Sequence, residues 1–179
     1  MTREGQRALV RAMLVVALGT LGFFLLARPV REFEAAAAAA LLRLFGADGV
    51  SSPGGASIAV FPAGHVPFVA LVTAACSSLP ALLAIAALGS FTSTGPPARR
   101  AAAIGAALAV VLLGNVLRIA ASVAVGLIAG RSSLVLFHDW VGSVFTFAYA
   151  LGGYTLMLFL LLPRRRSPAS TAEVHPVAA

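Results

Sequence analysis

Three side chains in this apolar sequence are of types that could carry out chemistry together. Cys76 is the sole cysteine of the chain, Arg118 lies in the run GNVLRIAAS, and His138 lies in LFHDWVG. A thiolate is a nucleophile, an imidazole transfers protons near neutral pH, and a guanidinium stabilises developing negative charge. These residue types indicate catalysis by a thiol, provided that the fold brings them together.

Each of the three also has a structural interpretation. Free cysteines often pack as small apolar side chains, and a histidine beside a tryptophan is common in the interfacial belt of membrane proteins. Arg118 could extend to lipid headgroups, but a charge deep in a bilayer costs about 2.5 kcal/mol or more, and intramembrane charges usually face the bundle interior. Asn115 lies one turn earlier on the same helical face and could orient Arg118.

Two further residues are weaker candidates for supporting roles. Ser77 follows the cysteine directly and would keep its surroundings polar, and Asp139 follows His138 and could orient its ring. Adjacent residues on a helix point in different directions, which argues against the second of these roles.

The composition is that of a polytopic membrane protein. Apolar residues make up 60% of the chain, charged residues 11%, and the mean hydropathy is +0.97. The net charge of +7 comes from arginines at the ends of apolar segments and not on one aromatic-bearing surface. We therefore expect membrane lipid as a partner and no nucleic acid.

Redox and metal chemistry are disfavoured by the same residues. A single cysteine cannot form an internal disulfide, and histidines 65, 138 and 175 lack metal-ligand spacing. We expect neither a cofactor nor a metal.

The sequence predicts an all-α fold with about four transmembrane helices in one domain, residues 1–162, followed by a disordered cytoplasmic tail, 163–179. The first apolar segment is interpreted as an uncleaved span, because no small-residue cleavage pattern follows it directly. The predicted spans cover residues 12–27, 76–94, 101–118 extending toward 130, and 141–162. Residues 119–129 either prolong the third helix or turn back along the bilayer.

The region between the first two spans is expected to lie outside. Residues 32–45 predict an amphipathic helix on the membrane or packed beside it, and residues 57–60 and 66–72 predict a short hairpin. Residues 66–91 could instead form one helix, which would bury Cys76 at the bilayer centre. Ser77-Ser78 followed by Pro80 favours a helix that begins near the cysteine.

The arginines predict that both termini are cytoplasmic. Eight of the thirteen then lie inside: Arg3, Arg7, Arg11, Arg99, Arg100, Arg164, Arg165 and Arg166. Counted from the inner helix ends at about 1.5 Å per residue, Cys76, Arg118 and His138 lie roughly 28, 27 and 37 Å away, against a hydrocarbon core of about 30 Å. All three are therefore expected at the outer face of the cytoplasmic membrane.

The order of a cysteine, an Asn-x-x-Arg-Ile motif in an apolar helix, and a histidine before the last span resembles the exosortase/archaeosortase family of membrane-embedded cysteine transpeptidases. The resemblance covers roughly residues 55–162. Ser78 stands where the family often has glycine, and many members have about eight spans. The chain thus looks like a compact variant.

The resemblance implies a function in sorting exported proteins. Members process substrates with a C-terminal signal made of a short motif such as Pro-Glu-Pro, a transmembrane helix and a basic tail. Carried over, Cys76 would be the nucleophile, Arg118 the electrostatic stabiliser and His138 the proton-transfer residue. The thioacyl enzyme would be resolved by an amine or glycan acceptor, or by water.

A non-catalytic membrane assembly or scaffold protein is the alternative. In that case Cys76 and His138 could be replaced without loss of function, whereas loss of Arg118 would weaken folding. A small transporter is disfavoured because no other row of charged or polar residues lines a span.

Overall fold

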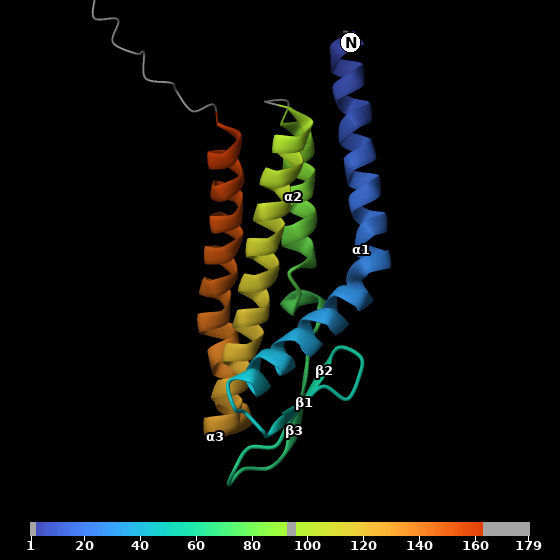
Figure 1. Cartoon of the computed structure of the whole chain (residues 1–179). Coiled ribbons are helices and arrows are strands. Elements are labelled where there is room, and N and C mark those ends of the chain that lie inside the picture. Colours follow the sequence, from blue (N-terminus) through green and yellow to red (C-terminus); the bar gives the residue numbers. More distant parts are fainter. Residues whose placement is uncertain (1–2, 93–95, 163–179) are drawn as a thin grey trace, which may run out of the picture.

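A computed structural model describes residues 3–92 and 96–162 of the chain. Its elements are, in order, α1 (Arg3–Leu44), β1 (Val50–Ser51), β2 (Ser57–Val60), β3 (Phe68–Leu71), the 3-10 turn η1 (Ala74–Cys76), α2 (Leu79–Phe91) and α3 (Pro97–Leu161). The sheet lies at the end of the molecule away from the N-terminus (Figure 1). The predicted tail, 163–179, and the last two residues of the predicted span 76–94 lie outside the described residues.

The long helix α3 consists of two antiparallel segments, 97–129 and 131–161, joined at Gly130 (Figure 1). Gly130 has φ 80° and ψ 178°, a backbone conformation that residues with a Cβ rarely adopt. At the other end of the pair, Arg99 Nε donates to the Leu160 carbonyl at 2.8 Å. Of the two courses considered for residues 119–129, the helical extension is the one observed.

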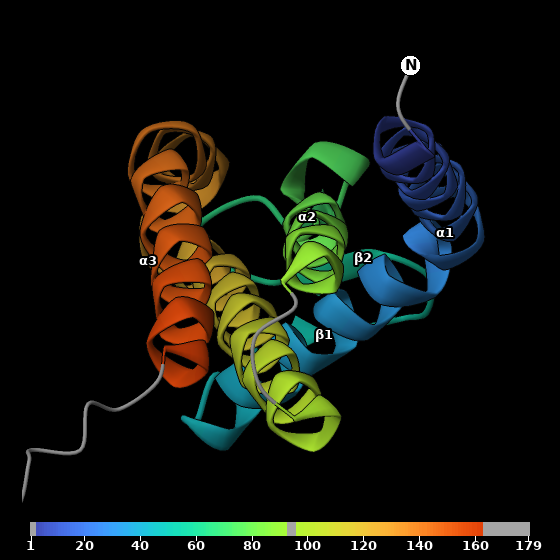
Figure 2. The same ribbon diagram turned by 90° about the horizontal axis from the view of Figure 1, so that it is seen from above.

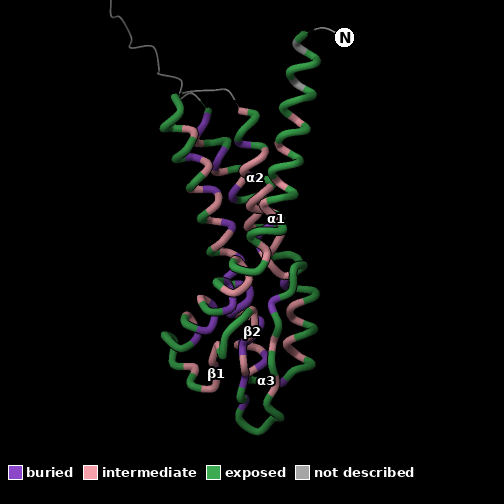
Figure 3. The backbone as a smooth tube through the Cα atoms, turned by 90° about the vertical axis from the view of Figure 1, so that its right-hand side faces the viewer, coloured by how far each residue is buried: buried purple, intermediate pink, exposed green. Residues whose placement is uncertain are grey.

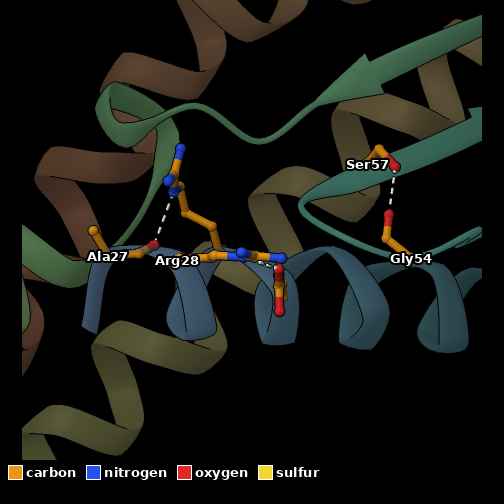
Figure 4. Close-up of polar contacts among 6 residues, drawn as sticks. Ala27, Arg28, Gly54 and Ser57 are labelled. Carbon is orange, nitrogen blue, oxygen red and sulfur yellow. Dashed lines mark hydrogen bonds and ion pairs between the residues drawn. The ribbon is translucent and has the colours of Figure 1, made fainter. Parts of the chain in front are cut away.

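Helix α1 joins two regions that the sequence predicts as separate helices, 12–27 and 32–45. It contains Pro29 and bends part-way along its length (Figure 1). Proline removes one backbone donor and bends a helix without always ending it. Near the bend, Arg31 Nε donates to the Ala27 carbonyl at 2.8 Å, and Arg28 pairs with Glu32 (Figure 4).

The predicted hairpin is confirmed as part of a three-stranded antiparallel sheet of order β1-β2-β3. In β2 and β3, Ser57 lies opposite Leu71 and Val60 opposite Phe68. The second strand is shorter than the predicted 66–72 and begins just after Pro67, which has no backbone N–H for a ladder. Ser57 Oγ donates to the Gly54 carbonyl at 2.8 Å and closes the loop before β2 (Figure 4).

Two apolar clusters hold the elements together. The second half of α1 packs on the sheet and α3 through a helical stripe of small residues that includes Ala35, Ala38, Ala39 and Leu42. The other cluster packs α2 against both segments of α3 through residues such as Ile85, Val111 and Met157. Figure 3 shows that buried residues gather in these regions, whereas the N-terminal part of α1 is largely exposed. Seen from above, α2 lies between α1 and α3 (Figure 2).

The protein is a mostly helical membrane protein. In the described part of the chain, two helices, Gly5–Leu44 and Pro97–Leu161, are long and apolar enough to cross a bilayer, and the second of them doubles back. Helix α2 has 13 residues and not the 19 predicted for 76–94. That length is about 20 Å, less than a hydrocarbon core of about 30 Å. The count of four spans stays a prediction.

Candidate active site

The structure brings Cys76, Arg118 and His138 together from three segments that are distant in sequence. The distance from Cys76 Sγ to His138 Nε2 is 3.1 Å, and from Arg118 Nη2 to the same nitrogen it is 3.2 Å. Cys76 ends η1, Arg118 lies on the first segment of α3, and His138 lies on the second. The reversal at Gly130 is what brings the arginine and the histidine face to face.

Cys76 precedes α2 and does not begin it. Ser77 has extended backbone angles, φ −81° and ψ 147°, which separate η1 from the helix, and Pro80 lies in the first turn of α2. Neither a helix over 66–91 nor one starting at Cys76 is therefore formed. The Ser77 hydroxyl accepts the Leu79 N–H at 3.2 Å, so this predicted supporting residue helps to start α2.

The surroundings of Cys76 favour the thiolate. The hydrogen bond with His138 is the largest influence and lowers the pKa of the thiol to about 7, in opposition to partial burial. The Thr73 hydroxyl donates to Sγ at 3.1 Å and acts in the same direction. Thr73 is not among the residues predicted from the sequence, and two side-chain hydrogen bonds, with His138 and Thr73, lower this pKa.

Arg118 faces the interior of the bundle and is only 6% exposed. Its Nη1 donates to the Cys76 carbonyl and to Asn115 Oδ1, both at 3.3 Å. Gly142 on the facing segment leaves room for it, since a Cβ there would lie 2.9 Å from Arg118 Nε. That Nε has no hydrogen-bond partner among the described residues. The guanidinium is thus held inside the bundle, at the Cys76 carbonyl and the imidazole.

A buried carboxylate that the sequence analysis missed supports this arrangement. Glu34 is fully buried, and its Oε1 accepts from Ser78 N at 2.8 Å, Ser78 Oγ at 2.5 Å and Asn115 Nδ2 at 2.9 Å. Asn115 also donates to the Cys76 carbonyl at 3.0 Å and accepts from Tyr149 Oη at 3.0 Å. Glu34 directly precedes the alanine run 35–40, and an acid bordering a stripe of small residues is the signal that could have found it.

Glu34 also compensates the buried cation without touching it. Asn115 lies between the two charges, with its amide nitrogen on the carboxylate and its amide oxygen on Arg118. A buried charge is tolerated when an opposite charge and hydrogen bonds accompany it. The predicted supporting role of Asn115 in orienting Arg118 therefore has a direct structural basis.

Asp139 does not join the cluster. Its side chain is exposed, and within the described part of the chain its carboxylate makes no hydrogen bond, while its backbone carbonyl accepts from Ser143 Oγ at 2.6 Å. Asp139 therefore does not orient His138, as expected for neighbours on a helix. His65 lies beside the Gly130 turn, and His175 is outside the described residues.

A cavity of about 230 Å³ opens beside the thiol and the imidazole, between β3 and α3. It is large enough for a few side chains of a peptide and is mostly apolar. Residues 3–92 and 96–162 contain no group of three His, Cys, Asp or Glu side chains that could hold a metal ion. The arrangement can generate a thiolate next to a proton acceptor and a fixed positive charge, which suits attack on a carbonyl group.

The family model for the transmembrane exosortase EpsH matches residues 2–161 of this chain. Searches of curated proteins and of solved structures found no match. The matched range includes every residue of the cluster described above.

Proposed function

The chain belongs to the transmembrane exosortase family, and from that premise we propose that it is a membrane cysteine transpeptidase or protease that cleaves C-terminal sorting signals of exported proteins. Family membership supports a membrane sorting transpeptidase in general. The observation that carries the finer proposal is the 3.1 Å contact between Cys76 Sγ and His138 Nε2, with Arg118 on the same nitrogen.

In the proposed first step, the thiol proton passes to His138 Nε2 and Cys76 Sγ attacks a peptide carbonyl. The carbon–nitrogen bond then breaks, and His138 gives the proton to the leaving amine. The product is a thioester between Cys76 and the new C-terminus of the exported protein. An acceptor amine, glycan hydroxyl or water then gives a proton to His138 and attacks the thioester carbonyl. The carbon–sulfur bond breaks, and His138 returns the proton to Cys76 Sγ.

Arg118 controls which proton state precedes attack. A guanidinium only donates, so its contact with Nε2 requires that nitrogen to carry the lone pair, with the ring proton on Nδ1. The thiol competes for the same lone pair. Once Nε2 takes the thiol proton, two donors face each other, and Arg118 is freed to stabilise the thiolate or the oxyanion of the tetrahedral intermediate.

The depth of the cluster supports a site at the outer face. From Pro97 to Arg118 and from Leu161 to His138 the helices rise about 32 and 35 Å, close to the hydrocarbon thickness of about 30 Å. With the arginine-rich ends inside, as the positive-inside rule favours, the thiol lies at the opposite boundary. A substrate anchored by a helix with a basic tail would present its preceding motif at that level.

The test is co-expression with a reporter that ends in Pro-Glu-Pro, a transmembrane helix and a basic tail. Processing is expected in the wild type and lost in Cys76→Ala and Cys76→Ser at normal protein levels. If the protein is a scaffold, Cys76→Ala and His138→Ala should leave its function intact, whereas replacement of Arg118 should lower the amount of folded protein. A reporter left intact by the wild type would contradict the proposed substrate.

A further inference from the structure

The cavity beside the thiol lies between β3 and α3. On the α3 side its wall includes Arg131, Leu134, Val135 and His138, which follow the i, i+3, i+4, i+7 pattern of one helical face. On the opposite side it is lined by residues 69–72, and its floor includes Ile119 and Val123. We call this the β3 groove.

Within residues 3–92 and 96–162, one edge of β3 has no strand paired with it. β3 is an edge strand, with β2 on one side only. Val72 N donates to the Ala56 carbonyl at 2.8 Å, and hydrogen-bonded pairs alternate along an antiparallel ladder. The N–H and C=O groups of Val69 and Leu71 therefore point away from β2. A free edge of this kind is a template for another strand.

We propose that the β3 groove binds the substrate segment before the scissile bond as a fourth strand, parallel to β3, with Arg131 selecting an acidic side chain. This inference rests on the proposed function. The occupant is an extended peptide that hydrogen-bonds the free edge at Val69 and Leu71 and places its carbonyl at Cys76. Apolar side chains of the peptide contact the floor of the groove.

The direction follows from the order of the elements. β3 leads through η1 into α2, and so runs from the sheet toward the helical bundle (Figure 1). A substrate whose transmembrane helix follows its cleaved motif enters in the same direction. Its added strand is therefore parallel to β3, and it would extend the sheet at an exposed edge, as in other cases of strand addition.

The charge requirement follows from the spacing along α3. Arg131 is exposed, and no ion pair found within residues 3–92 and 96–162 involves it. It precedes His138 by seven residues, about 10 Å of helix. A strand covers that distance in about three residues at 3.3 Å each. An acidic side chain about three residues before the scissile carbonyl would meet the guanidinium.

Proline substitutions on β3 test the strand pairing. Val69→Pro and Leu71→Pro each remove one N–H from the free edge and none from the ladder with β2. Each is expected to process the reporter about tenfold more slowly than the alanine variant of the same residue, which keeps the N–H. As a control for folding, iodoacetamide should still alkylate Cys76 in all four variants. Equal processing by the proline and alanine variants would overturn the inference.

Cross-linking tests the same inference without catalysis. Cys76→Ala removes the chain's only cysteine, so that Leu71→Cys provides a single thiol. Reporters with one cysteine scanned through the motif should form disulfides most strongly at one position and more weakly two positions to either side, and Val69→Cys should move that strongest position by two residues. Uniform or absent cross-links would overturn strand addition. The cross-linking test does not require catalysis. If the wild type leaves the reporter intact, that outcome counts against the proposed function and not against strand addition.

A charge exchange tests the role of Arg131. Arg131→Glu should slow processing of a reporter with an acid three residues before the cleavage site by about tenfold, and an arginine in place of that acid should restore it. An Arg131→Glu variant that processes both reporters like the wild type would contradict selection by this residue.

Discussion

At the scale of single residues, the candidate site depends on competition for one nitrogen. His138 Nε2 is within 3.2 Å of both Cys76 Sγ and Arg118 Nη2, and it has only one lone pair. The proton state of this nitrogen thus links the reactivity of the thiol to the position of the arginine. The pH dependence of thiol reactivity reports on this link directly.

Removal of the imidazole is expected to raise the pKa of Cys76. The thiol has a pKa of about 7 because of His138 first and Thr73 to a lesser degree. In wild type, alkylation by iodoacetamide should therefore rise with pH around a midpoint near 7. His138→Ala should move that midpoint upward toward the ordinary value for cysteine, and Thr73→Ala should move it less. An unchanged midpoint in His138→Ala would show that the contact does not set thiol reactivity.

The sequence alone predicts the three residues of the cluster and the support from Asn115, but not the contributions of Thr73 and Glu34. Cys76, Arg118 and His138 are conspicuous because each is unusual in an apolar chain. Thr73 and Glu34 are not, because a threonine in a loop and a glutamate near the start of a predicted helix have many ordinary explanations. Their roles depend on distances across the fold, and the position of Glu34 beside the alanine run 35–40 is a local signal for one of them.

At the scale of elements, the carboxylate of Glu34 ties α1 to the start of α2 and to α3. It accepts two hydrogen bonds from Ser78 and one from Asn115 through a single oxygen. Loss of an acceptor for buried donors costs about 1–3 kcal/mol for each group left unsatisfied. The connection is thus expected to matter for folding as well as for the position of Arg118.

Substitutions of Glu34 separate those two contributions. Glu34→Ala should lower the thermal stability of the detergent-solubilised protein and its yield, because the donors of Ser78 and Asn115 lose their acceptor. Glu34→Gln keeps an acceptor oxygen but removes the negative charge, so the fold should persist. Reporter processing should fall about tenfold or more, because the positive charge of Arg118 then lacks a nearby negative charge. Wild-type processing in Glu34→Gln would mean that the negative charge is dispensable.

The packing of the two α3 segments gives a second prediction at this scale. In Gly142→Ala the new Cβ would lie 2.9 Å from Arg118 Nε, the end of a flexible side chain that can move. Stability should change little, whereas processing should fall by about 10²-fold as the guanidinium is displaced. Gly152→Ala is the matched control, because a Cβ there has no neighbour within 4 Å. Equal processing by both variants would exclude a functional role for the position of Arg118.

The helical class and the opposite directions of the last two predicted spans are predictable from the sequence, whereas the reversal at Gly130 and the helix ends are not. Pro29 lies inside α1, where the sequence suggests a break, because packing of the alanine stripe on the sheet keeps the helix continuous. α2 begins three residues after Cys76, because Ser77 adopts an extended conformation and Ser78 is bound by Glu34. Both differences arise from tertiary contacts.

At the scale of the whole molecule, the arrangement has a basic end and a reactive end. The N-terminus and the Arg99 contacts with the end of α3 lie at one end, and the sheet lies at the other (Figure 1). The positive-inside rule predicts that the basic end is cytoplasmic. The thiol is then expected to be accessible from outside the cell membrane.

Labelling of intact cells tests this orientation. A membrane-impermeant maleimide added outside should modify Cys76, the only thiol of the chain. In a Cys76→Ala background, Ser90→Cys places a thiol at the exposed far end of α2, and that thiol should react only after the membrane is permeabilised. The reverse pattern would invert the proposed topology.

The central claim is that Cys76 becomes acylated by the exported protein. Mass spectrometry of the enzyme co-expressed with the reporter should find the reporter's new C-terminal residue joined to the peptide that contains Cys76, as a thioester that hydroxylamine removes. The adduct should be absent from Cys76→Ala, in which the reporter stays intact. Cleavage of the reporter by Cys76→Ala at the wild-type rate, with no adduct on Cys76 in wild type, would contradict the account.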